Sequence, residues 1–236
     1  MRDRSTHWLV LTLLLALAQP ACEEDQILVS TVPAKTLLRY YHAMSTNHAT
    51  TYVTATFYTD AGFDVQNNPW GKHVTLDGKA SIALNGAPLQ YNEPGMLSGT
   101  TYTLKLKDWP QRFTFTYTDP QGKKHVDKVT MDRIDAGADF FKSSSTGDVV
   151  VWEGSPVRQG ETVDVSLGST DTNLHYQTRQ VGARRIAVPG LPPGYDWKLF
   201  KQIDISRTLR KRLHKALMDD DEYGVYIKLV YQVNEF

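Results

Sequence analysis

The sequence predicts an all-β fold, with two antiparallel β-sandwich units in series and a short amphipathic helix in the second unit. From residue 51 onward, apolar and polar residues alternate with a period of two, as in strands that bury one face. Turn residues recur about every eight to twelve residues, which favours a sandwich over a βαβ fold. The chain also lacks a second long apolar segment after its first twenty residues.

Residues 1–21 are predicted to be a signal peptide. Arg2 and Arg4 place positive charge in residues 1–7, and residues 8–18 form an apolar stretch interrupted only by Thr12. A charged start followed by an apolar core of this length is typical of an export signal. The stretch is shorter than the ~20 apolar residues that cross a bilayer. We therefore expect the remainder of the chain to be exported.

Cys22 is the only cysteine and is predicted to carry a lipid. The segment QPAC at 19–22 resembles the lipobox of bacterial lipoproteins, in which the cysteine is acylated and becomes the first residue. Acylation would also protect a thiol that faces an oxidising compartment unpaired. More than one acyl chain holds a protein stably at a membrane. Two alternatives stay open: cleavage after ALA at 16–18 with plain secretion, and an uncleaved anchor.

Charge and composition exclude several partners. The chain has 26 basic and 26 acidic residues, and loss of residues 1–21 removes Arg2, Asp3 and Arg4, which leaves 24 basic and 25 acidic residues. Such a balance gives no global field that would recruit nucleic acid or an acidic substrate. No intramolecular disulfide is available to a chain with one cysteine, so packing must hold the fold. We expect no cofactor.

The first predicted sandwich covers residues 50–132 and follows a tether or short helix at 22–49. Helix-compatible spacing of Leu37, Leu38, Tyr41 and Met44 suggests that helix. Within the sandwich, TYVTATFYT, HVTL, SIALN, TYTLKLK, RFTFTYT and KKHVDKVTM predict strands. Asp-Pro-Gln-Gly at 119–122 matches a type I turn and predicts a β-hairpin there. Turns are also predicted at Asp77-Gly78 and Asn85-Gly86.

Residues 133–147 are predicted to link this unit to a second sandwich at 148–236. Strands are expected at VVVW, TVDVSL, RRIAV and YGVYIKLVYQV. Residues 206–218 predict a helix, because Leu209, Leu213, Ala216 and Leu217 share one helical face and Ser206 can cap it. The alternation of Leu209, Lys211 and Leu213 leaves a strand open as the alternative.

Both halves resemble the immunoglobulin-like modules found in tandem on bacterial surface lipoproteins. In the first half the resemblance rests on VTLDGKASIALNG, TYTLKLK and RFTFTYTDPQGKKHVDKVTM. In the second half, EYGVY at 222–226 is similar to the tyrosine corner of immunoglobulin domains, with Lys228 at the usual cysteine position. The resemblance implies a fold and a surface location and supplies no catalytic residues.

No complete catalytic motif is present in the sequence, and its histidines lack the HxH or HxxxH spacing of a local metal site. Asp219 and Asp221 belong to an acidic run that is a weak calcium candidate, although a solvated loop is the commoner outcome for such a run. A basic stripe could meet anionic lipid headgroups or simply form a solvated helix face. It consists of Arg207, Arg210, Lys211 and Lys215.

Aromatic residues next to Pro or Gly are the best recognition signal, because such rings can stay exposed on loops and stack on a sugar or peptide. They are Trp70, Trp109, Tyr195 and Trp197. Core packing is the commoner fate of tryptophan. We therefore expect a non-enzymatic, lipid-anchored binding or structural protein of the cell envelope that recognises a protein partner. A carbohydrate-binding module is the first alternative, and a hydrolase with a spatially assembled site is the second.

Overall fold

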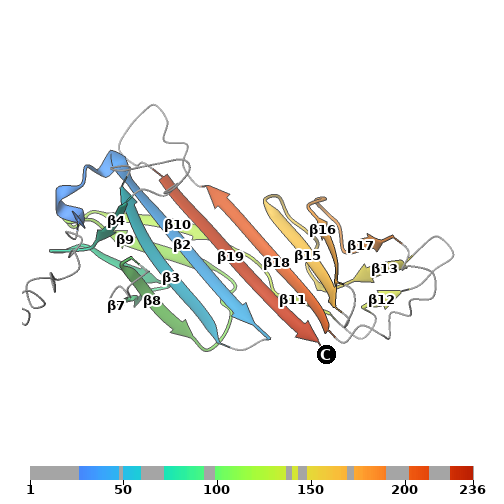
Figure 1. Ribbon diagram of the computed structural model, residues 1–236. Helices are drawn as coiled ribbons and strands as arrows, with labels where there is room; N and C mark the ends of the chain where they lie inside the picture. Colours follow the sequence, from blue (N-terminus) through green and yellow to red (C-terminus); the bar gives the residue numbers. More distant parts are fainter. Residues whose placement is uncertain are drawn as a thin grey trace, which may run out of the picture.

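A computed structural model of the chain describes residues 27–47, 50–59, 72–92, 99–136, 140–142, 148–168, 173–189, 202–212 and 224–235. Within these ranges every regular element is a strand, except for two 3-10 turns, η1 (Val29–Thr31) and η2 (Ala34–Thr36). The predicted all-β fold class is therefore confirmed. Figure 1 shows long strands forming one extended sheet, with shorter strands behind it and at one end.

The largest sheet has ten strands in the order β1-β4-β3-β2-β19-β18-β15-β16, with β8 and β7 added beside β3. Their bounds are β1 (Ile27–Leu28), β2 (Leu37–Thr46), β3 (Thr51–Thr59), β4 (Lys72–Thr75), β7 (Gln90–Asn92), β8 (Thr101–Leu106), β15 (Glu161–Gly168), β16 (Asn173–Thr178), β18 (Gln202–Arg212) and β19 (Gly224–Glu235). Most pairs are antiparallel, but β2 and β19 run parallel in the middle of the sheet.

Three smaller sheets complete the described part of the fold. One has the order β10-β9-β5-β6, one pairs β11 with β14, and one has the order β12-β13-β17. Their bounds are β5 (Ser81–Leu84), β6 (Ala87–Pro88), β9 (Phe113–Thr118), β10 (Lys124–Val129), β11 (Ile134–Asp135), β12 (Phe141–Lys142), β13 (Asp148–Val151), β14 (Glu153–Gly154) and β17 (Arg185–Val188).

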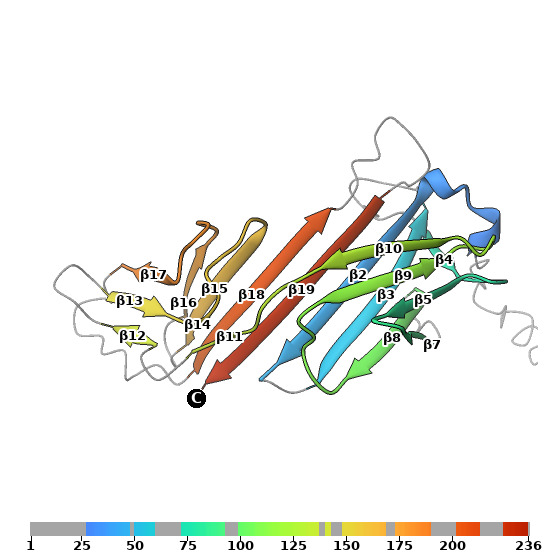
Figure 2. The same ribbon diagram turned by 180° about the vertical axis from the view of Figure 1, so that it is seen from behind.

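One part of the core lies between the ten-stranded sheet and the four-stranded sheet, and buried residues of β13, β15, β17 and β18 continue it at the other end. Figure 2 shows β5, β9 and β10 in front of β2, β3 and β19. The inward residues of β9 are aromatic: Phe115 stacks on Tyr41 of β2 at 4.4 Å between ring centroids, and Tyr117 lies 5.3 Å from Phe57 of β3. Because side chains alternate along a strand, every second residue of these strands enters this layer. The result is a two-layer β-sandwich at this end of the sheet.

The other face of the ten-stranded sheet is crossed by no described element and faces the viewer in Figure 1. On β2 this face carries Tyr40, His42 and Met44, which are partly exposed, while Leu37, Arg39 and Tyr41 on the opposite face are buried. One strand thus separates a closed core from an open surface.

The predicted hairpin at 113–129 is confirmed. β9 pairs with β10 from Phe113–Val129 to Thr118–Lys124, and Gly122 N donates to Asp119 O at 2.9 Å across the turn. Gly122 has φ +88°, a conformation that glycine adopts without steric cost. The strands expected elsewhere in both halves are present within the described residues.

The helix predicted at 206–218 is wrong over its described part, because residues up to Arg212 belong to strand β18. Ile205, Arg207 and Leu209 are buried at a period of two, while Ser206 and Thr208 face the other side. Strand β18 pairs with β15 on one side and with β19 on the other. Pairing with a strand on each side therefore stabilises these residues as a strand, although the spacing of the leucines also fits a helix.

The tether or short helix predicted at 22–49 is corrected in the same way. The residues with helix-compatible spacing belong to β2 (Leu37–Thr46), one of the central strands. The short turn η2 (Ala34–Thr36) precedes this strand. The predicted linker at 133–147 does not separate two sheets, because β2 and β3 from the first half share the ten-stranded sheet with β15, β16, β18 and β19 from the second.

Gly154 tests the packing of β14 against β11. It has φ +113°, and a Cβ atom there would lie 2.7 Å from the backbone oxygen of Arg133. Gly154→Ala should therefore lower the free energy of unfolding by about 1–3 kcal/mol through backbone strain and clash. Gly182→Ala is the control, since Gly182 has φ +88° but open space around its Cβ position. Equal losses in chemical denaturation would contradict the assigned clash.

Candidate functional site

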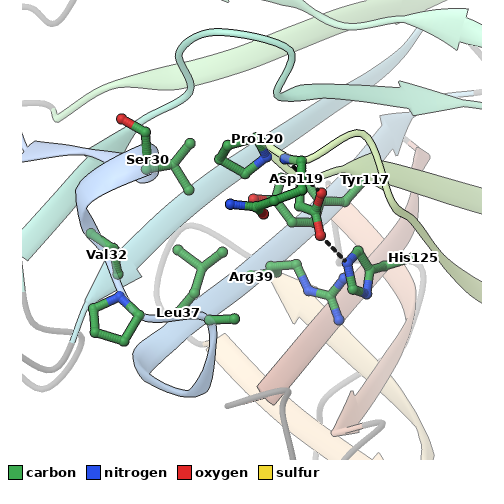
Figure 3. Close-up of a pocket in the computed structure, with 12 residues that line it drawn as sticks. Ser30, Val32, Leu37, Arg39, Tyr117, Asp119, Pro120 and His125 are labelled. Carbon is green, nitrogen blue, oxygen red and sulfur yellow. Dashed lines mark hydrogen bonds and ion pairs between the residues drawn. The ribbon is translucent and has the colours of Figure 1, made fainter.

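A pocket of about 250 Å³ opens at the η1 end of the sandwich. It lies between the segment that follows β1, the start of β2, and the turn that joins β9 to β10 (Figure 3). The residues that line it are Val29, Ser30, Val32, Pro33, Ala34, Leu37, Arg39, Tyr117, Asp119, Pro120, Gln121 and His125. Its size is close to the lower end of small-molecule sites, about 300 Å³.

The segment from 28 to 37 forms the apolar wall of this pocket and is held in place by short-range hydrogen bonds. Thr31 Oγ1 donates to Leu28 O at 2.7 Å, and Thr36 Oγ1 donates to Pro33 O at 2.9 Å. Ser30 donates to Asp77 from both its backbone N and its hydroxyl, at 2.9 and 2.5 Å. These contacts fix two tight turns next to the pocket.

Arg39 forms the floor of the polar side. It is only 3% exposed, because it points from β2 into the sandwich with Leu37 and Tyr41. Its Nη1 lies 3.8 Å from Asp127 Oδ2, and its guanidinium lies 5.5 Å from the centroid of the Tyr117 ring. A buried carboxylate and an aromatic face therefore surround this cation on two sides.

Asp119 and His125 form the rim of the polar side. His125 Nε2 hydrogen-bonds Asp119 Oδ2 at 3.1 Å, and Asp119 Oδ1 accepts from the backbone N of Gln121 and Lys123 at 3.0 and 2.8 Å. Burial alone would raise the pKa of Asp119, but the hydrogen bonds from His125 and the turn lower it overall. Asp119 is thus held as a carboxylate.

Tyr117 lies between the two polar groups. Its ring stacks on that of His125, with 5.6 Å between centroids. Burial raises the pKa of the Tyr117 phenol, and the neighbouring Asp119 carboxylate raises it further. The phenol therefore stays neutral and can donate a hydrogen bond.

The pocket geometry favours binding over nucleophilic chemistry. Ser30 is the hydroxyl-bearing aliphatic residue of the lining, and its hydroxyl donates to Asp77 and not to His125. Activation of a serine requires a base within hydrogen-bond reach. The His125–Asp119 pair has no such nucleophile among the described residues that line the pocket.

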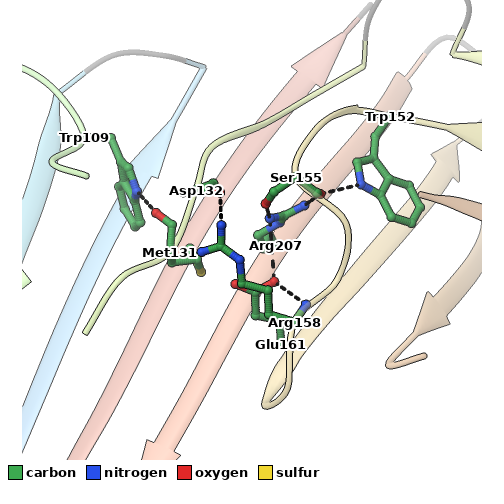
Figure 4. A network of polar contacts seen from close by, with 8 residues as sticks. All are labelled: Trp109, Met131, Asp132, Trp152, Ser155, Arg158, Glu161 and Arg207. Carbon is green, nitrogen blue, oxygen red and sulfur yellow. Dashed lines mark hydrogen bonds and ion pairs between the residues drawn. The ribbon is translucent and has the colours of Figure 1, made fainter. Parts of the chain in front are cut away.

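A second polar cluster surrounds Arg207 and is shown in Figure 4. Arg207 is fully buried, with Nη1 at 2.6 Å from Ser155 Oγ and Nη2 at 2.5 Å from Ser155 O. Nη1 also lies 3.6 Å from Glu161 Oε2, which accepts from Arg158 N at 2.9 Å. This network attaches the segment around Ser155 to β18 and β15, so it is structural.

The basic stripe predicted for membrane or phosphate contact does not exist as one face. Arg207 is buried, whereas Arg210 and Lys211 are exposed at the end of β18. In a strand, positions 207 and 210 lie on opposite faces. Lys215 lies outside the described residues.

Of the four predicted loop aromatics, only Trp109 falls within the described residues, and it belongs to the core. It is buried, its Nε1 donates to Met131 O at 2.8 Å, and its ring meets those of Phe113 and Tyr231 edge-on. The commoner core interpretation is therefore correct for Trp109.

Trp70, Tyr195 and Trp197 lie outside the described residues, as do Cys22, Asp219 and Asp221. In the part of the chain that is described, no cluster of three or more His, Cys, Asp or Glu could hold a metal ion.

The open face of the ten-stranded sheet is the second candidate region. We call the area around Met44, Tyr52, Lys105, Arg210 and Lys228 the docking face. Tyr52 is 58% exposed and Met44 is 38% exposed, and the two are directly opposite each other on β3 and β2. The ammonium group of Lys105 lies 5.6 Å from the Tyr52 ring centroid.

A row of polar residues crosses the docking face beside this pair. His42, Lys228 and Arg210 are direct neighbours on β2, β19 and β18. Burial lowers the pKa of His42, and the charge of Lys228 lowers it further, so the imidazole is neutral near pH 7. Lys228 and Arg210 place two positive charges opposite each other, which destabilises a pair of strands.

Sequence reasoning missed Arg39 and His125 as site residues. The signal for Arg39 was present: it has the same parity as Leu37 and Tyr41, which marks it as inward-facing once residues 37–46 are taken as a strand. His125 could be placed only through its register with Tyr117 across the predicted hairpin.

No family model matches this chain, and no curated protein matches it either. Among the described residues, no helix has the length and apolar character needed to cross a membrane.

Arg207 and Arg210 allow a matched test of the buried network. Arg207→Ala leaves Glu161 buried without its cation and should lower the free energy of unfolding by about 3–5 kcal/mol. Arg210→Ala removes the same charge from an exposed site on the same strand and should change it by less than about 0.5 kcal/mol. Urea denaturation followed by tryptophan fluorescence measures both, and similar losses would refute the structural role of Arg207.

Asp119→Asn tests the rim of the pocket. The lowered pKa means that the carboxylate stabilises the fold above its ordinary pKa of about 3.9, and that this contribution is lost as pH falls through the folded-state pKa. At pH 7 the variant should be less stable by about 1–2 kcal/mol. The difference should shrink below about pH 4. A difference that stays constant from pH 7 to pH 3 would contradict the assignment.

Proposed function

We propose that this is an exported, lipid-anchored and non-catalytic binding protein of the cell envelope, and that its docking face binds an acidic region of a partner protein. The observation that carries this proposal is the uncovered face of the ten-stranded sheet, on which exposed apolar and cationic side chains lie together. The N-terminal sequence supports export and the position of Cys22 supports the anchor.

The composition of the docking face fits protein recognition. Aromatic residues, Met and Arg are enriched at protein interfaces, and this face presents Tyr52 on β3, Met44 on β2 and Arg210 on β18 of the same sheet. A rigid sheet presents these groups with little loss of conformational entropy on binding. Tyr52 and Met44 form the apolar centre, and the charged groups form the surround.

Charge complementarity specifies an acidic partner. On β8, β3, β2 and β19, the described residues of the open face include Lys105 and Lys228 but no Asp or Glu, whereas the acidic residues of this face, Asp204 and Asp164, lie on β18 and β15. Lys228 and Arg210 repel each other across the strands, and carboxylates of a partner would relieve this repulsion. The same field would raise the rate of encounter with an acidic surface at low salt.

The likeness to immunoglobulin-like modules remains part of this proposal. Two face-packed antiparallel layers between residues 37 and 129 support it, as does the hairpin at 113–129. A carbohydrate-binding function loses support because Trp109 is buried.

Site-specific photo-crosslinking tests the docking face in the full chain. A photoreactive amino acid at position 52 should give a discrete adduct with one envelope protein. The same group at position 126, which is exposed on the four-stranded sheet, should give none. Identification of the partner by mass spectrometry should reveal an acidic crosslinked region. Equal adducts at both positions, or a basic crosslinked region, would overturn the proposal.

Charge reversal adds a matched control to this experiment. Lys228→Glu with Arg210→Glu should abolish the adduct from position 52. Lys124→Glu with Lys128→Glu makes the same change of charge at exposed positions of β10 and should leave the adduct intact. Loss of the adduct in both double variants would show that the charge of the face is not responsible.

Cys22→Ala tests the anchor separately. The wild-type protein should partition into the detergent phase, and its intact mass should include acyl chains on the residue at position 22. The variant should move to the aqueous phase because it lacks the site of acylation. Identical partitioning of both proteins, together with no acyl mass, would refute lipidation and leave the docking face untouched.

A further inference from the structure

We infer that the pocket between η1 and the β9–β10 turn binds a small neutral molecule with an apolar body and a hydrogen-bonding head. This site is independent of the docking face. Arg39 and Leu37 point from β2 toward the pocket, whereas His42 and Met44 belong to the opposite face of the same strand. One strand therefore supports two separate sites.

The wall made by the N-terminal segment supplies the surface for the apolar body. Figure 3 shows Val32 and Leu37 on one side of the pocket, opposite the polar groups of Asp119 and His125. Val29, Pro33 and Pro120 extend the apolar lining. Contact with these side chains would remove apolar ligand surface from water, which favours binding. The cavity admits a short chain or a single ring rather than a polymer.

The charges of the polar side argue for a neutral head. Arg39 is accompanied by Asp127 at 3.8 Å, and the Asp119 carboxylate is accompanied by His125 at 3.1 Å. Both charged groups of the polar side therefore already have protein partners: Arg39 has Asp127, and the Asp119 carboxylate accepts from His125 and from two backbone N–H groups of its own turn. A charged head would have to be desolvated against these pairs without a compensating partner.

Hydrogen-bonding capacity on the polar side is mixed. Asp119 accepts, the neutral phenol of Tyr117 donates, and the amide of Gln121 can do both. A primary amide or a hydroxyl group presents a donor and an acceptor in the same small space. The head group that fits is therefore an amide or an alcohol.

The pocket is preformed, which favours binding of a small molecule. Ser30 is tied to Asp77, Asp119 is tied to the backbone of its own turn, and Arg39 is buried. Rigid walls reduce the entropy that a ligand must overcome to bind.

Three probes with the same apolar chain test the head group: hexanamide, hexanoate and hexylamine. In two-dimensional amide NMR titrations of the exported full chain, hexanamide should shift the signals of Ser30 and Gln121 saturably. Hexanoate and hexylamine should bind at least about tenfold more weakly, a difference of about 1.4 kcal/mol. Tighter binding of either ion, or the absence of saturable shifts with hexanamide, would overturn the inference.

Two variants locate the site. Val32→Trp fills the pocket and should weaken hexanamide binding at least about tenfold. Val181→Trp adds the same ring at an exposed turn outside the pocket and should leave binding unchanged. Gln121→Leu changes an exposed turn residue that the fold does not need, so it tests the head group even where Val32→Trp fails to fold. Unchanged affinity in Gln121→Leu and in folded Val32→Trp would remove the pocket as the site, while the crosslinking result at position 52 would stand on its own.

Discussion

The parallel pairing of β2 with β19 is the contact on which the rest of the described structure depends. It joins the first long strand to the last, over the register from Leu38–Gly224 to Thr46–Gln232. Without it, the strands β3, β4 and β8 on one side and β18, β15 and β16 on the other would be separate sheets with exposed edges. Because it links residues far apart in sequence, its closure is costly in chain entropy.

Both candidate sites inherit their geometry from this pairing. Because β2 is held between β3 and β19, its alternating side chains are fixed to two opposite faces. Arg39 is thereby placed in the core beside Asp127, at the floor of the pocket. His42 is placed next to Lys228 on the open face. A shift of one residue in register would exchange these two sets and destroy both sites.

The sequence allowed the strands and hairpins to be predicted where local signals agreed. Asp119-Pro120-Gln121-Gly122 satisfied the turn preferences position by position, and Phe113, Phe115 and Tyr117 alternated without interruption. Prediction failed for residues 37–46 and 206–212. There the spacing of apolar residues fitted a helix as well as a strand. Because Arg39 and Arg207 are charged residues at inward positions, they interrupted the alternation of apolar and polar residues that indicates a strand. A charged residue is expected at the surface, so its burial depends on a partner that sequence spacing cannot reveal.

Those partners explain why the sites were harder to predict than the strands. Arg207 is neutralised by Glu161 from another strand, and Arg39 by Asp127 from another sheet. Each pair requires two chain segments to meet, and that meeting is a property of topology rather than of local pattern. Burial of such pairs contributes little net stability, but removal of one partner is costly, so they strongly disfavour other registers. The two arginines therefore act mainly as determinants of which strands lie side by side, and the pocket and the docking face follow from that choice.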